Sequence, residues 1–294
     1  MKKTLAVSIV LGFSHLQAQT DTDVYLLDIY ASANGIELGS PKNISNNIGY
    51  DNQPSFYNDN IVLFSSNRNG QTDIAKYNIG DSARSWLTDT PEGGEYSPLK
   101  IPGKNEVSAI RLDKDGLQRL YRYDFDTGKS TLLLEDLKVG YHVWFNKDIL
   151  VSAVLIEDRM DLVVSNLKDR THYTFQRNVG RSLHRIPNTD LISYISKENE
   201  DWEIRSLNPI SGASQTLCKT IPQREDMCWL INGTILMGNG NILSQFDPKN
   251  DKQWKSLKTF GKKNINNITR LRANAISTKL LMVADETAPS LKKQ

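Results

Sequence analysis

The sequence lacks a surplus of charge of either sign, and it lacks long apolar segments. Its 294 residues include 36 Lys and Arg against 34 Asp and Glu, which gives a formal net charge of +2. Such a balance provides no basic surface to attract nucleic acid or anionic lipid, so neither is expected as a partner. After the first residues, no segment approaches the roughly 20 apolar residues of a membrane-spanning helix, so no transmembrane segment is expected.

Signatures of catalysis and metal binding are also missing. The segment Gly180–His184 resembles a Gly-x-Ser-x-Gly nucleophile elbow but ends in His, and no His-Glu-x-x-His motif occurs. The acidic segments Asp113–Gly116 and Asp124–Gly128 lack the later ligands of a calcium loop, so hairpin turns explain them. The only cysteines, Cys218 and Cys228, have no partner at a zinc-ligand spacing. We therefore predict no catalytic residue, no metal ligand and no cofactor, which favours a non-enzymatic role.

The first 18 residues are typical of a signal peptide. Lys2 and Lys3 form a basic start, residues 5–13 are apolar, and Ala18 is a plausible cleavage position. Cleavage removes both lysines, so 34 basic and 34 acidic residues remain and the mature net charge is zero. No Cys lies at the cleavage point, so a lipid anchor is not indicated, and a periplasmic or secreted protein is expected. At the other end, residues 286–294 are expected to form a disordered tail.

What the sequence does contain is one pattern repeated six times. An apolar run is followed by a turn, then by a second half-apolar run that ends in Asn or Asp, then by a short strand. The apolar runs begin 45, 43, 41, 44 and 45 residues apart. They are Val62–Phe64, Val107–Ile110, Leu150–Val154, Leu191–Tyr194, Ile235–Met237 and Leu280–Val283. A period of this length is typical of the four-stranded blades of a β-propeller.

The second run predicts how the ring of blades closes. It follows five of the six apolar runs but is missing after Leu280. At the other end of the chain, Val24–Ile29 and Ile36–Leu38 supply an inner and an outer strand with no preceding partners. The two ends therefore complete one blade, which removes the unpaired edge of an open ring. We predict an all-β fold, a six-bladed β-propeller of four-stranded antiparallel blades, as a single domain over residues 19–285.

The blade pattern also bears on the cysteines and tryptophans. Cys218 is predicted on the outer strand of the fourth blade and Cys228 on the inner strand of the fifth. A disulfide needs Cα atoms within about 7 Å, so this radial separation favours two free, buried thiols. An even number of cysteines in an oxidising compartment keeps the disulfide open as an alternative. The five tryptophans are scattered through different blades, and most are expected to wedge between sheets.

The best-defined motif runs from Gln53 to Gly70 and is followed by Thr72-Asp-Ile74. An inner strand ends in Pro-Ser-Phe, an Asn- and Asp-rich turn follows, and the next strand closes with Ser-Asn-Arg-Asn-Gly. Gly70 permits positive φ, and Arg68 can hold carbonyl groups or a carboxylate. This motif resembles the WD40-like repeat of TolB-like periplasmic propellers. One blade carries it in full, the second keeps parts of it, and the others keep the spacing.

The resemblance implies an exported binding scaffold of the bacterial cell envelope, without catalysis, whose partner is an envelope protein or peptide. TolB has an additional amino-terminal domain, for which the space after Gln19 is too small, so a stand-alone propeller is expected. A monomer is also expected.

Functional residues of a propeller are expected where the entry loops of the six inner strands converge on the axis. Alignment of the repeats places six residues at comparable positions of this mouth, which are Asp51, Glu95, His142, Arg181, Asp226 and Asn267. Their mixed charge could seat a peptide or a small polar ligand. Channel mouths are also polar simply because they are wet, and that explanation stays open.

The alternative function is a calcium-dependent lactonase or esterase that uses the channel. The ion would then be held by Glu95, Asp226, Asn52 and Asn267, and His142 or His184 would move a proton. This alternative rests on analogy with other six-bladed propellers.

Overall fold

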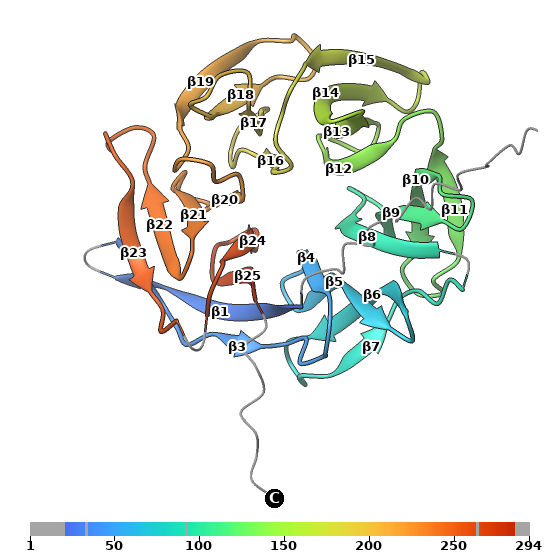
Figure 1. Cartoon of the computed structure of the whole chain (residues 1–294), viewed down its shortest axis with the longest axis horizontal. Helices are drawn as coiled ribbons and strands as arrows, with labels where there is room; N and C mark the ends of the chain where they lie inside the picture. The colour runs from blue at the N-terminus through green and yellow to red at the C-terminus, as the bar shows by residue number, and fades with distance from the viewer. Residues whose placement is uncertain (1–20, 33–34, 92, 263–264, 286–294) are drawn as a thin grey trace, which may run out of the picture.

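The computed structural model describes residues 21–285, except 33–34, 92 and 263–264. In this part of the chain, 25 β-strands form six antiparallel sheets around a central axis (Figure 1). The predicted six-bladed β-propeller is confirmed. No helix of the described residues is long and apolar enough to cross a membrane. The predicted signal peptide, residues 1–18, and the predicted tail, residues 286–294, lie outside the described residues.

Blades 1 to 5 each consist of four consecutive strands, which follow one another from the axis outward. Blade 1 contains β4 (Asp51–Asn58), β5 (Ile61–Arg68), β6 (Gln71–Asn78) and β7 (Arg84–Trp86). Blade 2 contains β8 (Gly93–Lys100), β9 (Glu106–Asp113), β10 (Gln118–Asp124) and β11 (Ser130–Leu134). Blade 3 contains β12 (Val139–Trp144), β13 (Ile149–Ile156), β14 (Arg159–Asn166) and β15 (Thr171–Gln176). Blade 4 contains β16 (His184–Arg185), β17 (Ile192–Ser196), β18 (Glu203–Leu207) and β19 (Ser214–Lys219). Blade 5 contains β20 (Met227–Trp229), β21 (Ile235–Asn239), β22 (Ile242–Phe246) and β23 (Lys255–Thr259).

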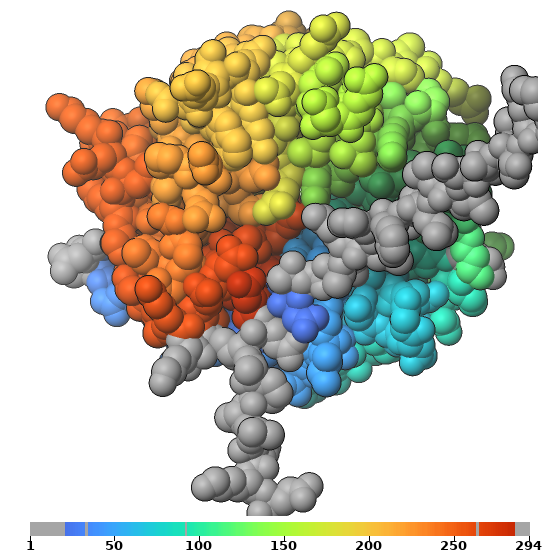
Figure 2. Space-filling model, viewed as in Figure 1, coloured from blue at the N-terminus to red at the C-terminus, as the bar shows by residue number. Residues whose placement is uncertain are grey.

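Blade 6 joins the two ends of the described chain. From the axis outward it contains β24 (Thr269–Ala273), β25 (Lys279–Asp285), β1 (Thr22–Ser32) and β2 (Gly35–Leu38), and the short β3 (Lys42–Asn43) also pairs with β1. β1 pairs antiparallel with β25 over seven residue pairs. The blue and red ends of the colour scale accordingly lie side by side in Figures 1 and 2. The predicted closure by amino-terminal strands is confirmed, with β1 as the third strand from the axis and β2 as the outermost.

The repeated apolar runs are the second strands of the blades, and the packing of β25 shows why they are apolar throughout. Its residues from Leu280 to Ala284 are all buried. Successive side chains of a strand point to opposite faces, so such a run must be covered on both faces. Leu280 packs in one cluster with Leu236 of blade 5, whereas Leu281 packs in another with Phe64 of blade 1. Burial of each such side chain contributes about 1.5–3 kcal/mol.

The motif of blade 1 has the geometry expected from its residues. Gly70 has a φ of 84°, in the left-handed region that glycine tolerates. Arg68 donates from Nε to the Asp73 carboxylate at 2.9 Å and from a terminal nitrogen to the Thr88 carbonyl oxygen at 3.1 Å. The planar guanidinium therefore joins β5 and β6 to the segment that leaves the blade.

Both cysteines occupy the strands predicted for them. Cys218 lies in β19, the outer strand of blade 4, and Cys228 lies in β20, the inner strand of blade 5. Both are free, Cys228 is buried and Cys218 is half-buried. The favoured alternative of two free thiols therefore describes the structure.

Candidate functional site

Two cavities lie along the axis of the ring. The larger has a volume of about 470 Å³ and is lined by residues at the ends of all six inner strands. The smaller has a volume of about 80 Å³ and is lined by residues nearer the beginnings of these strands. Leu99, His184 and Arg272 belong to both walls, so the cavities are stacked along one channel and meet at these side chains. The larger cavity therefore lies where the inner strands end, whereas the sequence predicts the mouth where the inner strands begin.

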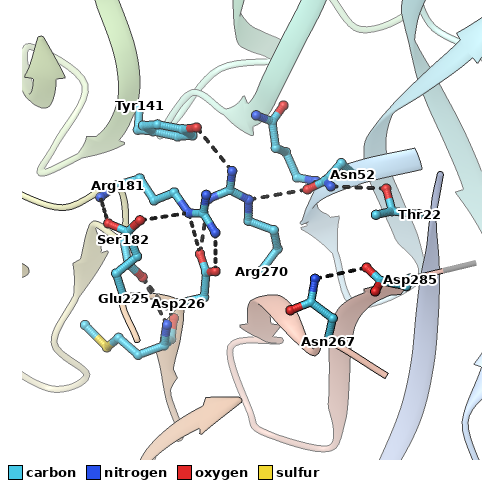
Figure 3. A network of polar contacts seen from close by, with 12 residues as sticks. Thr22, Asn52, Tyr141, Arg181, Ser182, Glu225, Asp226, Asn267, Arg270 and Asp285 are labelled. Carbon is cyan, nitrogen blue, oxygen red and sulfur yellow. Dashed lines mark hydrogen bonds and ion pairs between the residues drawn. The ribbon is translucent and has the colours of Figure 1, made fainter. Parts of the chain in front are cut away.

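Arg270 fills the narrow end of the channel. Its guanidinium donates to Asp226 at 3.1 Å, to the Tyr141 hydroxyl at 3.1 Å and to Asn52 Oδ1 at 3.3 Å (Figure 3). Arg181 donates to the same Asp226 carboxylate at 2.9 and 2.5 Å. Arg270 comes from blade 6, and its three partners come from blades 5, 3 and 1. One side chain therefore connects four blades across the axis.

Bulges in the inner strands direct polar side chains toward this constriction. The register of β24 against β25 shifts between Thr269 and Arg272, and Arg270 there has a φ of 47°. Matching shifts in β4 and β8 contain Gln53 and Ser97, with φ values of 54° and 53°. Arg270, Gln53 and Ser97 all line the smaller cavity. Because a bulge re-aims the side chain that it carries, it accounts for polar residues of the inner strands reaching the channel.

Three of the six predicted mouth residues are absent from the walls of both cavities. These residues are Asp51, Glu95 and Asn267. Asn267 is exposed and donates to the Asp285 carboxylate at 3.0 Å, in a contact separate from the Arg270 network (Figure 3). The position at the axis that the repeats assign to Asn267 is taken instead by Arg270.

Asp51 and Glu95 are carboxylates buried within the ring. Glu95 accepts from the hydroxyls of Thr88 and Tyr123, each at 3.3 Å, and so lies between blades 1 and 2. Burial raises the pKa of Glu95 to about 7 and the pKa of Asp51 to about 6. Neither group is presented to a ligand in the channel.

The other three predicted residues, His142, Arg181 and Asp226, do line the smaller cavity. Burial and the charge of Arg272 lower the pKa of His142 to about 3, so this imidazole is neutral. Burial alone would raise the pKa of Asp226, but the charges and hydrogen bonds of Arg270 and Arg181 bring it below its ordinary value. The structure thus brings together half of the predicted set, and a role in ligand binding stays a prediction for all six.

Comparison with known proteins finds likeness in structure rather than in sequence. No protein-family model and no curated protein matches the sequence. The structure of a putative TolB from Agrobacterium tumefaciens aligns with a TM-score of 0.68 at 8% identity, over 91% of this chain and 99% of that one. TolB from Acinetobacter baumannii aligns with a TM-score of 0.56 at 11% identity, over 91% of this chain and 64% of that one. This chain has the fold of a TolB-like propeller.

The same fold likeness extends to proteins of another kind. A chain of the nidogen/laminin complex aligns with a TM-score of 0.62 at 11% identity, over 90% of this chain and 98% of that one. At such identities the likeness describes the fold and does not assign a function.

Two channel residues, Arg270 and Arg272, belong to no motif that the sequence offers. They lie two positions apart in β24, and Leu271 between them is buried. The sequence does contain one signal for them, which is the pair of cations at alternate positions of a predicted inner strand. An inner strand is enclosed, so a cation on it needs a partner. Arg272 donates to Nδ1 of His184 at 2.9 Å.

Two tryptophans join neighbouring blades and also line the larger cavity. The indole N–H of Trp144 donates to Ser108 at 2.8 Å, and that of Trp229 donates to Ser193 at 2.8 Å. Each bond connects the inner strand of one blade to the second strand of the preceding blade. This position agrees with the expected role as wedges, and it makes both indoles reporters of what enters the cavity.

The four residues of the calcium alternative do not converge on one point, although Asn52 and Asp226 both accept hydrogen bonds from Arg270. Glu95 lies between two blades, Asn267 contacts Asp285, and Asp226 is held by two arginines. Among the described residues, no group of three or more His, Cys, Asp or Glu could hold a metal ion.

Proposed function

We propose that this propeller is a non-catalytic binding scaffold whose larger cavity accepts a peptide or a segment of a protein partner. The cavity itself carries the proposal, because all six blades line its volume of about 470 Å³, which lies in the range of ligand pockets. Its wall combines the rings of Tyr57, Trp144 and Trp229 with the cations of Lys100 and Arg185. Aromatic rings beside charged groups suit a chain that has both apolar and polar parts.

The proposal includes export to the periplasm or beyond, as a monomer. It is supported by the leader pattern of residues 1–18. The mature protein is expected to begin at Gln19, and amino-terminal sequencing of the protein recovered from an envelope fraction checks this. Recovery from the cytoplasm with Met1 retained would contradict export.

Selection from a random heptapeptide library against the purified full chain tests peptide binding. Fluorescence of Trp144 and Trp229 reports whether selected peptides reach the cavity. Ala275 is an exposed residue of the cavity wall, so Ala275→Trp should narrow the opening with little effect on stability. We expect this substitution to weaken binding of the selected peptides at least tenfold.

The matched control is Ala83→Trp, which adds the same indole at an exposed turn between β6 and β7. It should leave peptide affinity unchanged. Equal affinity of wild type and Ala275→Trp would place the binding surface elsewhere. Failure of the wild-type chain to retain any peptide would refute the proposed function.

A further inference from the structure

The channel contains more cationic than anionic side chains. Five cations and two carboxylates line its two cavities. The cations are Lys100, Arg181, Arg185, Arg270 and Arg272, and the carboxylates are Asp59 and Asp226. The chain as a whole has a net charge of only +2, so the surplus is a local property of the channel. A cationic, enclosed wall favours an anionic ligand.

Arg272 is a channel cation without an ion pair among the described residues. It lies where the two cavities meet, and its guanidinium donates to Nδ1 of His184 at 2.9 Å. No carboxylate of the described residues forms an ion pair with it, whereas Arg270, two positions earlier, has Asp226 at 3.1 Å. A cation enclosed without a carboxylate is costly, so the fold alone does not account for Arg272.

His184 does not supply the missing negative charge. An arginine only donates hydrogen bonds, so His184 Nδ1 is the acceptor, and the ring proton sits on Nε2, 3.0 Å from Ser182 Oγ. Burial and the charge of Arg272 lower the pKa of His184 well below its ordinary value. A neutral His184 orients the guanidinium and leaves its remaining N–H groups for another acceptor.

A second side chain beside the junction has an unused polar atom. His142 is 4% exposed and lines the smaller cavity together with Arg272. Its Nε2 lies 2.8 Å from Ser108 Oγ, and its Nδ1 has no hydrogen-bond partner among the described residues. The Ser108 hydroxyl donates to the Leu99 carbonyl oxygen at 3.2 Å, so Nε2 carries the ring proton and donates to Ser108. Nδ1 is then an acceptor unpartnered in the described part of the chain, and Arg272 is the donor at this junction.

We infer that Arg272 forms a carboxylate-binding site at the floor of the larger cavity, and that this site takes the terminal carboxyl group of a bound peptide. The guanidinium fork matches the two oxygens of a carboxylate. At this point the larger cavity, of about 470 Å³, meets the smaller one, of about 80 Å³. The smaller space beyond Arg272 favours the end of a peptide chain over an internal segment. This inference rests on the proposed peptide-binding function.

Two random heptapeptide libraries with the wild-type full chain test the inference. One library has free terminal carboxylates and the other has terminal amides. Selected peptides with a free carboxylate should bind at least tenfold more tightly than the same sequences as amides. Equal affinity of acid and amide forms would overturn the assignment. If peptide amides bind only when they contain Asp or Glu, the site recognises a side-chain carboxylate instead of the terminal one.

Substitutions in the cavity wall assign the preference to a residue. Arg272→Met should lose the tenfold preference for the acid form while binding the amide form as wild type does. Arg185→Met removes another guanidinium of the same wall, one that donates to the Phe145 carbonyl at 2.6 Å, and should keep the preference. The unfolding temperature of Arg272→Met should equal or exceed that of wild type, because an uncompensated cation is removed. A fall of more than about 10 °C would assign Arg272 a structural role instead.

Acetate separates this inference from the proposed function. A saturable shift of the Arg272 Nε–H resonance with acetate, in a protein that retains no peptide, would keep the carboxylate site and overturn peptide binding. Peptide binding without a preference for the acid form would keep the proposed function and overturn the carboxylate site. A protein that responds to neither would overturn both.

Discussion

Charged side chains inside the ring are accommodated in three ways. Asp226 is shared by two arginines, so its charge is compensated within the narrow end of the channel. Glu95 is held between blades by hydroxyl groups, and burial favours its protonated form. Arg272 forms a hydrogen bond to a neutral imidazole and no ion pair with any described carboxylate. These three environments predict different responses to substitution.

Loss of the Asp226 charge is expected to destabilise the ring strongly. Asp226→Asn keeps the size of the side chain but deprives Arg270 of its ion pair at 3.1 Å. Removal of one partner of a buried ion pair leaves the other charge uncompensated, which costs about 3–5 kcal/mol. Urea unfolding at pH 7.5 measures the change in the free energy of unfolding.

The matched control is Asp201→Asn, because Asp201 forms an exposed ion pair with Lys219 at 2.6 Å. An exposed pair contributes at most about 1 kcal/mol, so this variant should unfold almost as wild type does. Similar small losses in both variants would show that the Arg270 network contributes little to stability.

Glu95 is expected to make the protein less stable as pH rises. Its folded-state pKa of about 7 exceeds the ordinary value of 4.5, so the folded state holds this proton more tightly than the unfolded state does. The free energy of unfolding should therefore fall between pH 4.5 and pH 7 and level off above, by roughly 3 kcal/mol from this group. Glu95→Gln removes the titration, so it should match wild type at pH 5 and exceed it at pH 8.

Urea unfolding at both pH values measures the difference between the two proteins, which isolates Glu95 from all other titrating groups. Glu135→Gln changes an exposed carboxyl group and should keep the wild-type dependence on pH. If Glu95→Gln loses stability equally at pH 5 and pH 8, the carboxyl group is ionised in the folded state at both.

At the scale of strands, the sequence predicts the sheets well and the channel poorly. The second strands are enclosed on both faces, so burial leaves a continuous apolar run such as Leu280–Val283 for each blade. The inner strands carry bulges at Gln53, Ser97 and Arg270, and a bulge shifts which face each later side chain occupies. Aligned residues of different blades therefore need not share a face.

The predicted site also contains aligned residues that face different ways. Glu95 and Asp226 occupy comparable positions in the repeat, yet Glu95 points between blades and Asp226 points into the channel. His142 could be predicted from its position within an inner strand, and Arg181 and Asp226 from their positions shortly before one. A cation at position 270 of an inner strand is a signal in the sequence, but the contacts of Arg270 across the axis could not be predicted, because they depend on a φ of 47°.

The bulge in β8 predicts an unusual response to glycine. Ser97 has a φ of 53°, which costs a non-glycine residue about 1–2 kcal/mol, and its buried hydroxyl has no partner among the described residues. Ser97→Gly should therefore leave stability unchanged or raise it by up to about 1 kcal/mol in urea unfolding.

The same change in a regular strand should have the opposite sign. Ser85 of β7 pairs with Lys76 of β6, so Ser85→Gly should lower stability by about 0.5–1 kcal/mol. Destabilisation of both variants by equal amounts would mean that Ser97 carries no conformational cost at its bulge.

At the scale of the whole molecule, stability depends on closing the ring. Each blade buries its faces against two neighbours, and blade 6 is complete only when β1 pairs with β25. Without β1, seven residue pairs are lost and the outer edge of β25 is left unpaired beside apolar side chains. Closure by distant segments also makes many contacts non-local, which favours slow folding.

A chain that lacks residues 1–40 is therefore expected to unfold at a lower temperature than wild type and to self-associate through the open edge. A synthetic peptide of residues 21–40 supplies β1 and β2, so it should raise the unfolding temperature of the truncated chain and return it to a monomer. Differential scanning calorimetry and light scattering measure the two effects.

Two variants of that peptide decide whether the native strand is what rescues the ring. Leu27 is 1% exposed and packs in the cluster that contains Leu236 of blade 5, so a Leu27→Asp peptide would bury a carboxylate and should fail to rescue. Tyr30 is 53% exposed, so a Tyr30→Asp peptide should rescue as well as the native one. If the truncated chain unfolds at the wild-type temperature, or if both variant peptides rescue it equally, closure by β1 does not hold the propeller together.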